Sequence, residues 1–284
     1  MSSSGKLLRI ARASQAPERS QGTAVVAFLE VTQGQEIELP VRPRFWKRPG
    51  FQEVLTFATL MLVYEWLRDL VAPTSSVLPL AHAQSVISGE RGIGLLVEPG
   101  LQRHVNGLPG GQSLVSWLYT LGHTPGFIVF FVWLWWRHRD QFSFVRTWFW
   151  LSHAVAVMVF WLWPLAPPRF SGLGMEDPTE QTLRLGGATS WFQPFRNLYA
   201  AMPSLHVGYT VLYAVVITLI GVSSWRFAAW MWPAAMLVVV MATANHFWLD
   251  GVGGALTVAA GCGLALVADR VSGAGMRKPW EQAT

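Results

Sequence analysis

The chain has 284 residues, of which 52% are hydrophobic and 13% are charged, and it contains 16 Trp and 16 Phe. Soluble domains average about 25% charged residues, so this composition argues against a large soluble core and indicates a protein that crosses a membrane several times. The single cysteine, Cys262, lies in an apolar stretch, which excludes a disulfide framework and a cysteine-based metal site.

The first fifty residues are polar and rich in arginine, and they lack the short apolar core of a signal peptide. We therefore expect residues 1–50 to form a cytoplasmic, largely disordered basic tail. Its closing cluster, VRPRFWKRPG (41–50), suits an anionic inner leaflet. A solvated linker that only fixes the topology explains the same cluster equally well.

A membrane helix needs about 20 mostly apolar residues. Residues 76–105 carry apolar side chains interrupted by glycine and charge, which predicts one or two amphipathic helices at the membrane interface. We expect an all-α polytopic membrane protein, with a six-span domain over 51–272 and a cytoplasmic C-terminal tail over 273–284. The six predicted spans are roughly 52–71, 113–136, 144–166, 205–222, 226–243 and 250–269.

The distribution of basic residues predicts the orientation in the membrane. With both termini inside, 15 of the 21 Lys and Arg residues fall in cytoplasmic segments, as the positive-inside rule requires. We expect an integral plasma membrane protein with cytoplasmic termini. The stretches PPRF (167–170), PSLH (203–206) and HFWLD (246–250) then converge at the outer face, and the active site is expected there.

His246 and Asp250 are four residues apart, so they would share one face of a helix. A carboxylate that accepts from one ring nitrogen fixes the tautomer and leaves the other nitrogen electron-rich, which suits a nucleophilic histidine. The alternative is that Asp250 caps the helix and His246 is an interfacial residue.

The stretch PSLH predicts a helix start, because Ser204 is a good N-cap and the free amides of a helix N-terminus suit phosphate. His206 in the first turn could protonate a leaving oxygen. Arg169, just beyond the third predicted span, could bind a phosphate with both guanidinium arms or anchor the span to lipid headgroups.

Together APPR (166–169), AMPSLHVG (201–208) and NHFWLD (245–250) resemble the motifs of the type 2 phosphatidic acid phosphatase superfamily. The closer likeness is to its inositol phosphorylceramide synthase-like branch, and it covers most of residues 52–270. The resemblance implies that His246 is the nucleophile, Asp250 its orienting partner, and His206 the acid for the leaving group and then the base for the acceptor. It also implies that Arg169 and Ser204 bind the phosphate, without a metal or another cofactor.

Two positions depart from the wider family, which has cations where this chain has Leu162 and Val240. We expect Arg184 or Arg196 in the outer loop to replace them. Asn245 or Thr243 could add hydrogen bonds to the phosphate.

The expected function is a lipid phosphatase if water is the acceptor, or a phosphotransferase, including an inositol phosphorylceramide synthase-like headgroup transferase, if an alcohol is the acceptor. The expected partners are a lipid phosphoester and membrane lipids, with no nucleic acid. A lipid transporter and a non-catalytic lipid-binding protein are the alternatives. The glycines of GVGGALTVAAGCG (251–263) predict close helix packing rather than a dinucleotide site.

Overall fold

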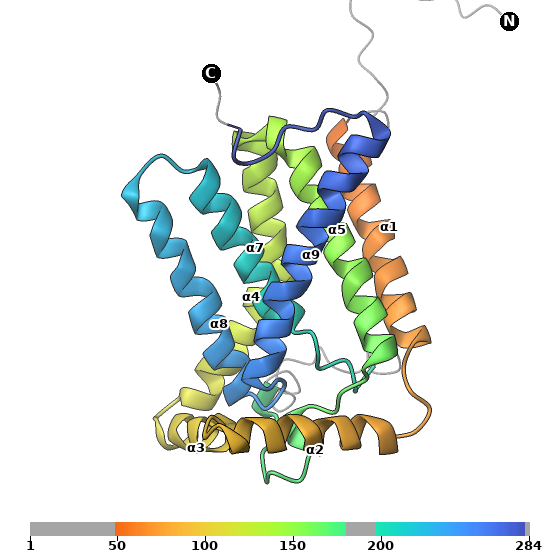
Figure 1. Ribbon diagram of the computed structural model, residues 1–284. Coiled ribbons are helices and arrows are strands. Elements are labelled where there is room, and N and C mark those ends of the chain that lie inside the picture. Colours follow the sequence, from red (N-terminus) through yellow and green to blue (C-terminus); the bar gives the residue numbers. More distant parts are fainter. Residues whose placement is uncertain (1–48, 180–196, 282–284) are drawn as a thin grey trace, which may run out of the picture. The chain divides into compact units, whose positions relative to one another are not determined.

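The computed structural model describes residues 49–179 and 197–281 (Figure 1). The predicted tail therefore lies outside the described residues up to residue 48, and so do Arg184 and Arg196. The chain divides into two compact units, Met1–Thr56 and Phe57–Thr284. Of the first unit the structure describes only the beginning of helix α1, and the site lies in the second unit.

Every regular element of the described residues is a helix, which confirms the predicted all-α class. Leu165 and Ala200 form an isolated parallel bridge outside these elements. In chain order the elements are α1 (Pro49–Leu70), α2 (Val77–Gly92), α3 (Glu98–Gly107), α4 (Gly111–Arg137), α5 (Arg139–Leu162), the 3-10 helix η2 (Pro168–Phe170), α7 (Leu205–Ile220), the 3-10 helix η4 (Ser224–Trp230), α8 (Met231–Ala242) and α9 (Trp248–Ser272).

Three described helices are long and apolar enough to cross a membrane: Arg139–Leu162, Ser224–Ala242 and Trp248–Ser272. A fourth is added if the bent pair Gly111–Gly122 and Pro125–Arg137 is one span. Helix α7 is apolar but has 16 residues, and at about 1.5 Å per residue it is shorter than a bilayer core. The structure thus supports three to four of the six predicted spans, and the count of six remains a prediction.

Helix α9 packs between α5 and α7, and α7 also packs against α8 (Figure 1). Two glycines of α9 allow its backbone to come close to Ser204, at the start of α7, and to Ser152 of α5. A Cβ on Gly254 would lie 2.2 Å from the carbonyl oxygen of Ser204, and one on Gly261 would lie 2.1 Å from Ser152 Oγ. Real Cβ atoms do not approach so closely, so the predicted glycine-mediated packing is confirmed.

The segment between α1 and α4 forms two helices rather than one. The break falls where Gly94 adopts φ +73°, a left-handed conformation that glycine takes at little cost. Helix α2 runs across the ends of the long helices, and the N-terminal ends of α7 and α9 lie at this same end (Figure 1). Their placement at a membrane interface remains a prediction.

Candidate active site

The turn between α8 and α9, residues 243–247, carries the first candidate residues. The backbone amides of Asn245 and His246 both donate to the carbonyl oxygen of Val240, each at 3.1 Å. Ala244 is fully buried and has φ 53°, which an alanine rarely adopts and which surrounding contacts must hold. This α8–α9 turn is therefore a tight, constrained connection rather than a loose loop.

His246 lies in that turn, two residues before α9 begins, so the prediction that it shares a helical face with Asp250 is wrong. Its Nδ1 lies 2.7 Å from the carbonyl oxygen of Ala201 and 3.5 Å from Asp250 Oδ2. A carbonyl can only accept a hydrogen bond, so Nδ1 carries the proton and Nε2 keeps its lone pair. Asp250 Oδ2 also accepts from the amide of Phe247 at 2.9 Å, so Asp250 caps α9 as well.

His206 lies in the first turn of α7, and the rings of His206 and His246 are 5.8 Å apart, centroid to centroid. The His206 ring stacks on Tyr119 of α4 at 4.2 Å with an interplanar angle of 22°. The predicted cap is present, because Ser204 is the N-cap residue and its Oγ accepts from the amide of Val207. The amide of Ser204 donates to the carbonyl of Asp250 at 2.8 Å, which ties the starts of α7 and α9 together.

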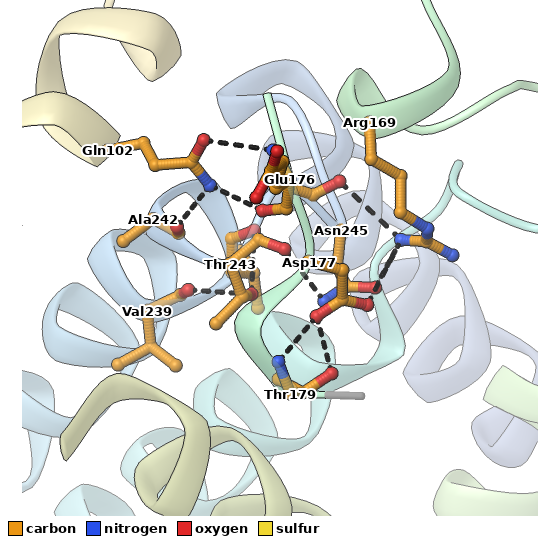
Figure 2. A network of polar contacts seen from close by, with 11 residues as sticks. Gln102, Arg169, Glu176, Asp177, Thr179, Val239, Ala242, Thr243 and Asn245 are labelled. Atoms are coloured by element: carbon orange, nitrogen blue, oxygen red, sulfur yellow. Dashed lines mark hydrogen bonds and ion pairs between the residues drawn. The ribbon is translucent and has the colours of Figure 1, made fainter. Parts of the chain in front are cut away.

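Arg169 reaches the α8–α9 turn from the 3-10 helix η2 (Figure 2). Its guanidinium donates to Asn245 Oδ1 and lies 3.8 Å from Asp177 Oδ2. Its backbone amide donates to the carbonyl of Ala244 at 3.2 Å. Asn245 Nδ2 in turn donates to the carbonyl of Thr243 at 3.1 Å. The arginine is thus held in a fixed orientation by three neighbours.

A cavity of about 110 Å³ lies where these elements meet. Two arginines and two histidines line it, and no acidic side chain of the described residues does. Apolar side chains, among them Phe160, Leu198 and Leu205, line it as well. The polar residues of the lining are Tyr64, Arg68, Tyr119, Arg169, Asn197, His206, Asn245 and His246.

The structure brings Arg169, His206, Asn245 and His246 together, as the convergence of the three motifs predicts. It places two other predicted residues differently. Ser204 is fully buried and absent from the cavity lining, so its hydroxyl serves the helix cap. Thr243 Oγ1 donates back to the carbonyl of Val239 in α8 at 2.9 Å (Figure 2).

Arg68 was missed by the sequence analysis, although it closes α1 in the charged stretch EWLRD (65–69). Arg68 lines the cavity, while Glu65 Oε2 lies 2.8 Å from its Nη2. Val240, where the wider family has a cation, is fully buried among apolar side chains. Leu162, the second such position, is 61% exposed at the end of α5. The described cations of the cavity are therefore Arg68 and Arg169.

The fold and the site define a class of protein. It is a helical protein with apolar, membrane-length segments and a cavity lined by cations at one end of its helices. The family model described as PAP2 superfamily matches residues 84–264, and the chain belongs to that superfamily. Members are generally phosphatases, which supports an enzyme of phosphatase or phosphotransferase type. No curated protein and no solved structure matches the chain in the same comparisons.

Proposed function

We propose that this protein is a membrane enzyme that transfers the phosphoryl group of a lipid phosphoester to His246 and then to an acceptor. The single observation that carries this proposal is the cavity lining, with two arginines, two histidines and no acidic side chain among the described residues. Such a lining suits a phosphate group. The apolar side chains of Phe160, Leu198 and Leu205 beside it suit the adjoining lipid.

In the first step, the Nε2 lone pair of His246 attacks phosphorus and the bond from phosphorus to the ester oxygen breaks. The imidazole is ready for this attack because the Ala201 carbonyl holds the proton on Nδ1. His206 gives a proton to the departing alkoxide oxygen. Arg169 stabilises the charge on the phosphoryl oxygens, with Asn245 fixing its orientation.

In the second step, water or an alcohol attacks the phosphohistidine. His206, deprotonated by the first step, takes the acceptor's proton, and the bond between phosphorus and Nε2 breaks. Water yields free phosphate, and an alcohol yields a new phosphoester. The motif likeness to the inositol phosphorylceramide synthase-like branch favours an alcohol. The membership of a superfamily whose members are generally phosphatases favours water.

We place the site at the outer face of the plasma membrane, with cytoplasmic termini and without a metal. The placement rests on the bias of 15 of 21 basic residues toward the cytoplasmic segments of this topology. The chemistry leaves the charge stabilisation to Arg169 and to backbone amides. Activity that survives prolonged treatment with EDTA would support the metal-independent reaction, and loss of activity that Mg²⁺ or Zn²⁺ restores would contradict it.

The decisive experiment uses the full chain in detergent micelles with dioctanoyl phosphatidic acid, farnesyl diphosphate and phosphatidylinositol, each with and without an added alcohol. Inorganic phosphate and headgroup-transferred lipid are followed together, for the native chain, for His246→Ala and for the control His104→Ala, which changes an exposed histidine of α3. Phosphate that disappears only in His246→Ala identifies a phosphatase. A new lipid that requires the alcohol identifies a transferase. Equal products from the native chain and His246→Ala would overturn the proposal.

A further inference from the structure

Helix α3 contacts both ends of the α8–α9 turn through two buried polar side chains. Glu98 and Gln102 lie four residues apart, on one face of the helix. Glu98 is fully buried and Gln102 is 5% exposed. Polar groups buried to this degree are costly unless they are hydrogen-bonded. The hydrogen-bond partners of Glu98 and Gln102 therefore indicate what these two side chains do.

Gln102 holds the end of α8. Its Nε2 donates to the carbonyl oxygens of Ala242 at 2.9 Å and of Glu176 at 2.7 Å (Figure 2). Its Oε1 accepts from the amide of Glu176 at 3.1 Å. The same side chain therefore fixes the last residue of α8 and the loop that carries Asp177, whose carboxylate lies beside Arg169.

Glu98 holds the beginning of α9. Its Oε1 accepts from the amide of Trp248 at 2.9 Å, while Glu90 Oε1 of α2 accepts from the amide of Leu249 at 3.4 Å. Both acceptors face the free amides at the N-terminus of α9, where acceptors are needed. The indole Nε1 of Trp248 donates to the carbonyl of Leu95, in the α2–α3 connection, at 3.0 Å.

From these contacts we infer that α3 is the positioning element of the active site, with Gln102 and Glu98 fixing the two ends of the turn that presents Asn245 and His246. This inference rests on the proposed function, because α3 positions a catalytic residue only if His246 is the nucleophile. The strained conformation of Ala244 in the middle of that turn needs such support, because a residue in this conformation persists only when its surroundings hold it. Glu98 and Gln102 are positioning residues, since neither lines the cavity.

Glu90 completes the arrangement from α2. Like Glu98 it is fully buried, and the two carboxylates accept from the neighbouring amides of Leu249 and Trp248. The strongest charged influences on Glu90 are Glu98 from α3 and Asp250 from α9, both acidic. Ionisation of both Glu90 and Glu98 would therefore gather negative charge at one buried point beside the start of α9.

The test compares Gln102→Ala and Glu98→Ala with Gln112→Ala, which truncates an exposed glutamine at the start of α4. Amide hydrogen exchange of the peptide covering 243–249 is the first readout, because it requires no activity. We expect faster exchange in that peptide for the two α3 variants and native exchange for Gln112→Ala. Faster exchange over the whole chain would instead show a general loss of stability and would overturn the inference.

The second readout is the steady-state kinetics with dioctanoyl phosphatidic acid. We expect kcat of both α3 variants to fall by about 100-fold, the cost of misplacing a reacting group by about 1 Å, with KM nearly unchanged because the cavity cations remain. Glu98→Gln keeps an oxygen for Trp248 and should restore kcat at neutral pH. If Glu98→Gln is as impaired as Glu98→Ala, or if KM rises and kcat does not fall, the inference is wrong.

The two readouts separate this inference from the proposed function. A native chain that hydrolyses none of the lipid phosphoesters would overturn the proposed function, while the exchange of peptide 243–249 would still decide whether α3 holds the turn.

Discussion

His246 Nδ1 lies 2.7 Å from the backbone carbonyl oxygen of Ala201, closer than the 3.5 Å to the carboxylate expected to orient it. A backbone carbonyl neither titrates nor changes rotamer. The tautomer that leaves Nε2 unprotonated is therefore set by the fold, and in the proposed mechanism the carboxylate of Asp250 stabilises positive charge on the ring.

Replacing Asp250 by asparagine should reduce activity less than replacing His246. In the serine protease triad, losing the aspartate costs about 10⁴-fold because the histidine takes the wrong tautomer. Here the Ala201 carbonyl keeps the tautomer, so we expect Asp250→Asn to lower kcat by about 10- to 100-fold, with only the charge effect lost. Steady-state kinetics of Asp250→Asn and His246→Ala side by side would decide the matter. Equal losses of kcat would show that the Ala201 carbonyl alone does not keep the tautomer.

Replacing His206 should matter most for substrates with poor leaving groups. An alkoxide needs a proton as it departs, whereas p-nitrophenolate does not, so loss of a general acid should lower alkyl ester cleavage by about 10²–10⁴-fold. We expect His206→Asn to show this loss with dioctanoyl phosphatidic acid, and a much smaller one in the first turnover of p-nitrophenyl phosphate. Rapid mixing isolates that turnover from the second step. A similar loss with both substrates would argue against His206 as the acid.

Arg169 should not tolerate lysine. Its Nη1 contacts both Asn245 and Asp177, and an ammonium on a flexible stem has no second nitrogen in a fixed plane to bind a phosphate. We expect Arg169→Lys to lower kcat/KM by about 10- to 100-fold, as for loss of one charge-assisted hydrogen bond. Arg91→Lys, which changes an exposed arginine of α2, is the matched control and should retain native kinetics. Native kinetics in both variants would remove Arg169 from the phosphate site.

An added methyl group at Gly254 should separate α7 from α9. Its Cβ would lie 2.2 Å from the Ser204 carbonyl oxygen and 3.1 Å from the amide nitrogen of Gly208, so backbone must move. We expect Gly254→Ala to destabilise the protein by about 1–3 kcal/mol and to lower activity. Gly263→Ala, on the same helix with nothing within 4 Å, should be neutral. Thermal unfolding in detergent measures both, and equal stability of the two variants would refute the close approach.

The buried pair in α2 and α3 should make stability depend on pH. Burial, and then repulsion from Glu98, raise the pKa of Glu90 from its ordinary value of 4.5 to about 8. The folded state therefore binds more protons than the unfolded state between these values, and stability falls as pH rises through that range. Glu90→Gln cannot ionise but keeps an oxygen for Leu249, so it should escape this loss.

Melting temperatures of Glu90→Gln and the native chain, measured from pH 5 to pH 9, test this expectation. The advantage of the variant should grow as pH rises. An advantage that stays constant or shrinks would mean that Glu90 is already ionised in the folded protein at low pH.

Much of the helical fold could be predicted from apolar stretches alone. The predicted spans 113–136 and 144–166 correspond to α4 and α5, because long apolar runs leave a chain few alternatives to a buried helix. The sequence did not show that α7 is only 16 residues long, or that η4 precedes α8 as a 3-10 helix. Helix ends depend on capping and on neighbours, which residue composition does not report.

The site was predictable where a motif is local and unpredictable where a contact joins distant segments. His206, His246 and Arg169 stand in recognisable motifs, and the structure brings them to one cavity. Tyr119 could not be found, because nothing in the apolar run of α4 indicates which aromatic side chain stacks on His206. Glu98 and Gln102 look like the solvated face of an amphipathic helix, and only the packing of α3 shows that they are buried.

The close approach of Gly254 to Ser204 limits which substitutions can give this protein a new substrate. At that point main chain faces main chain, so the separation of the two histidine-bearing segments does not depend on any side chain that can change rotamer. The walls formed by Phe160 and Leu198 have no such restriction. Selection for a different lipid should therefore accumulate substitutions in those walls and leave residue 254 as glycine, and a deep mutational scan under such selection would show it.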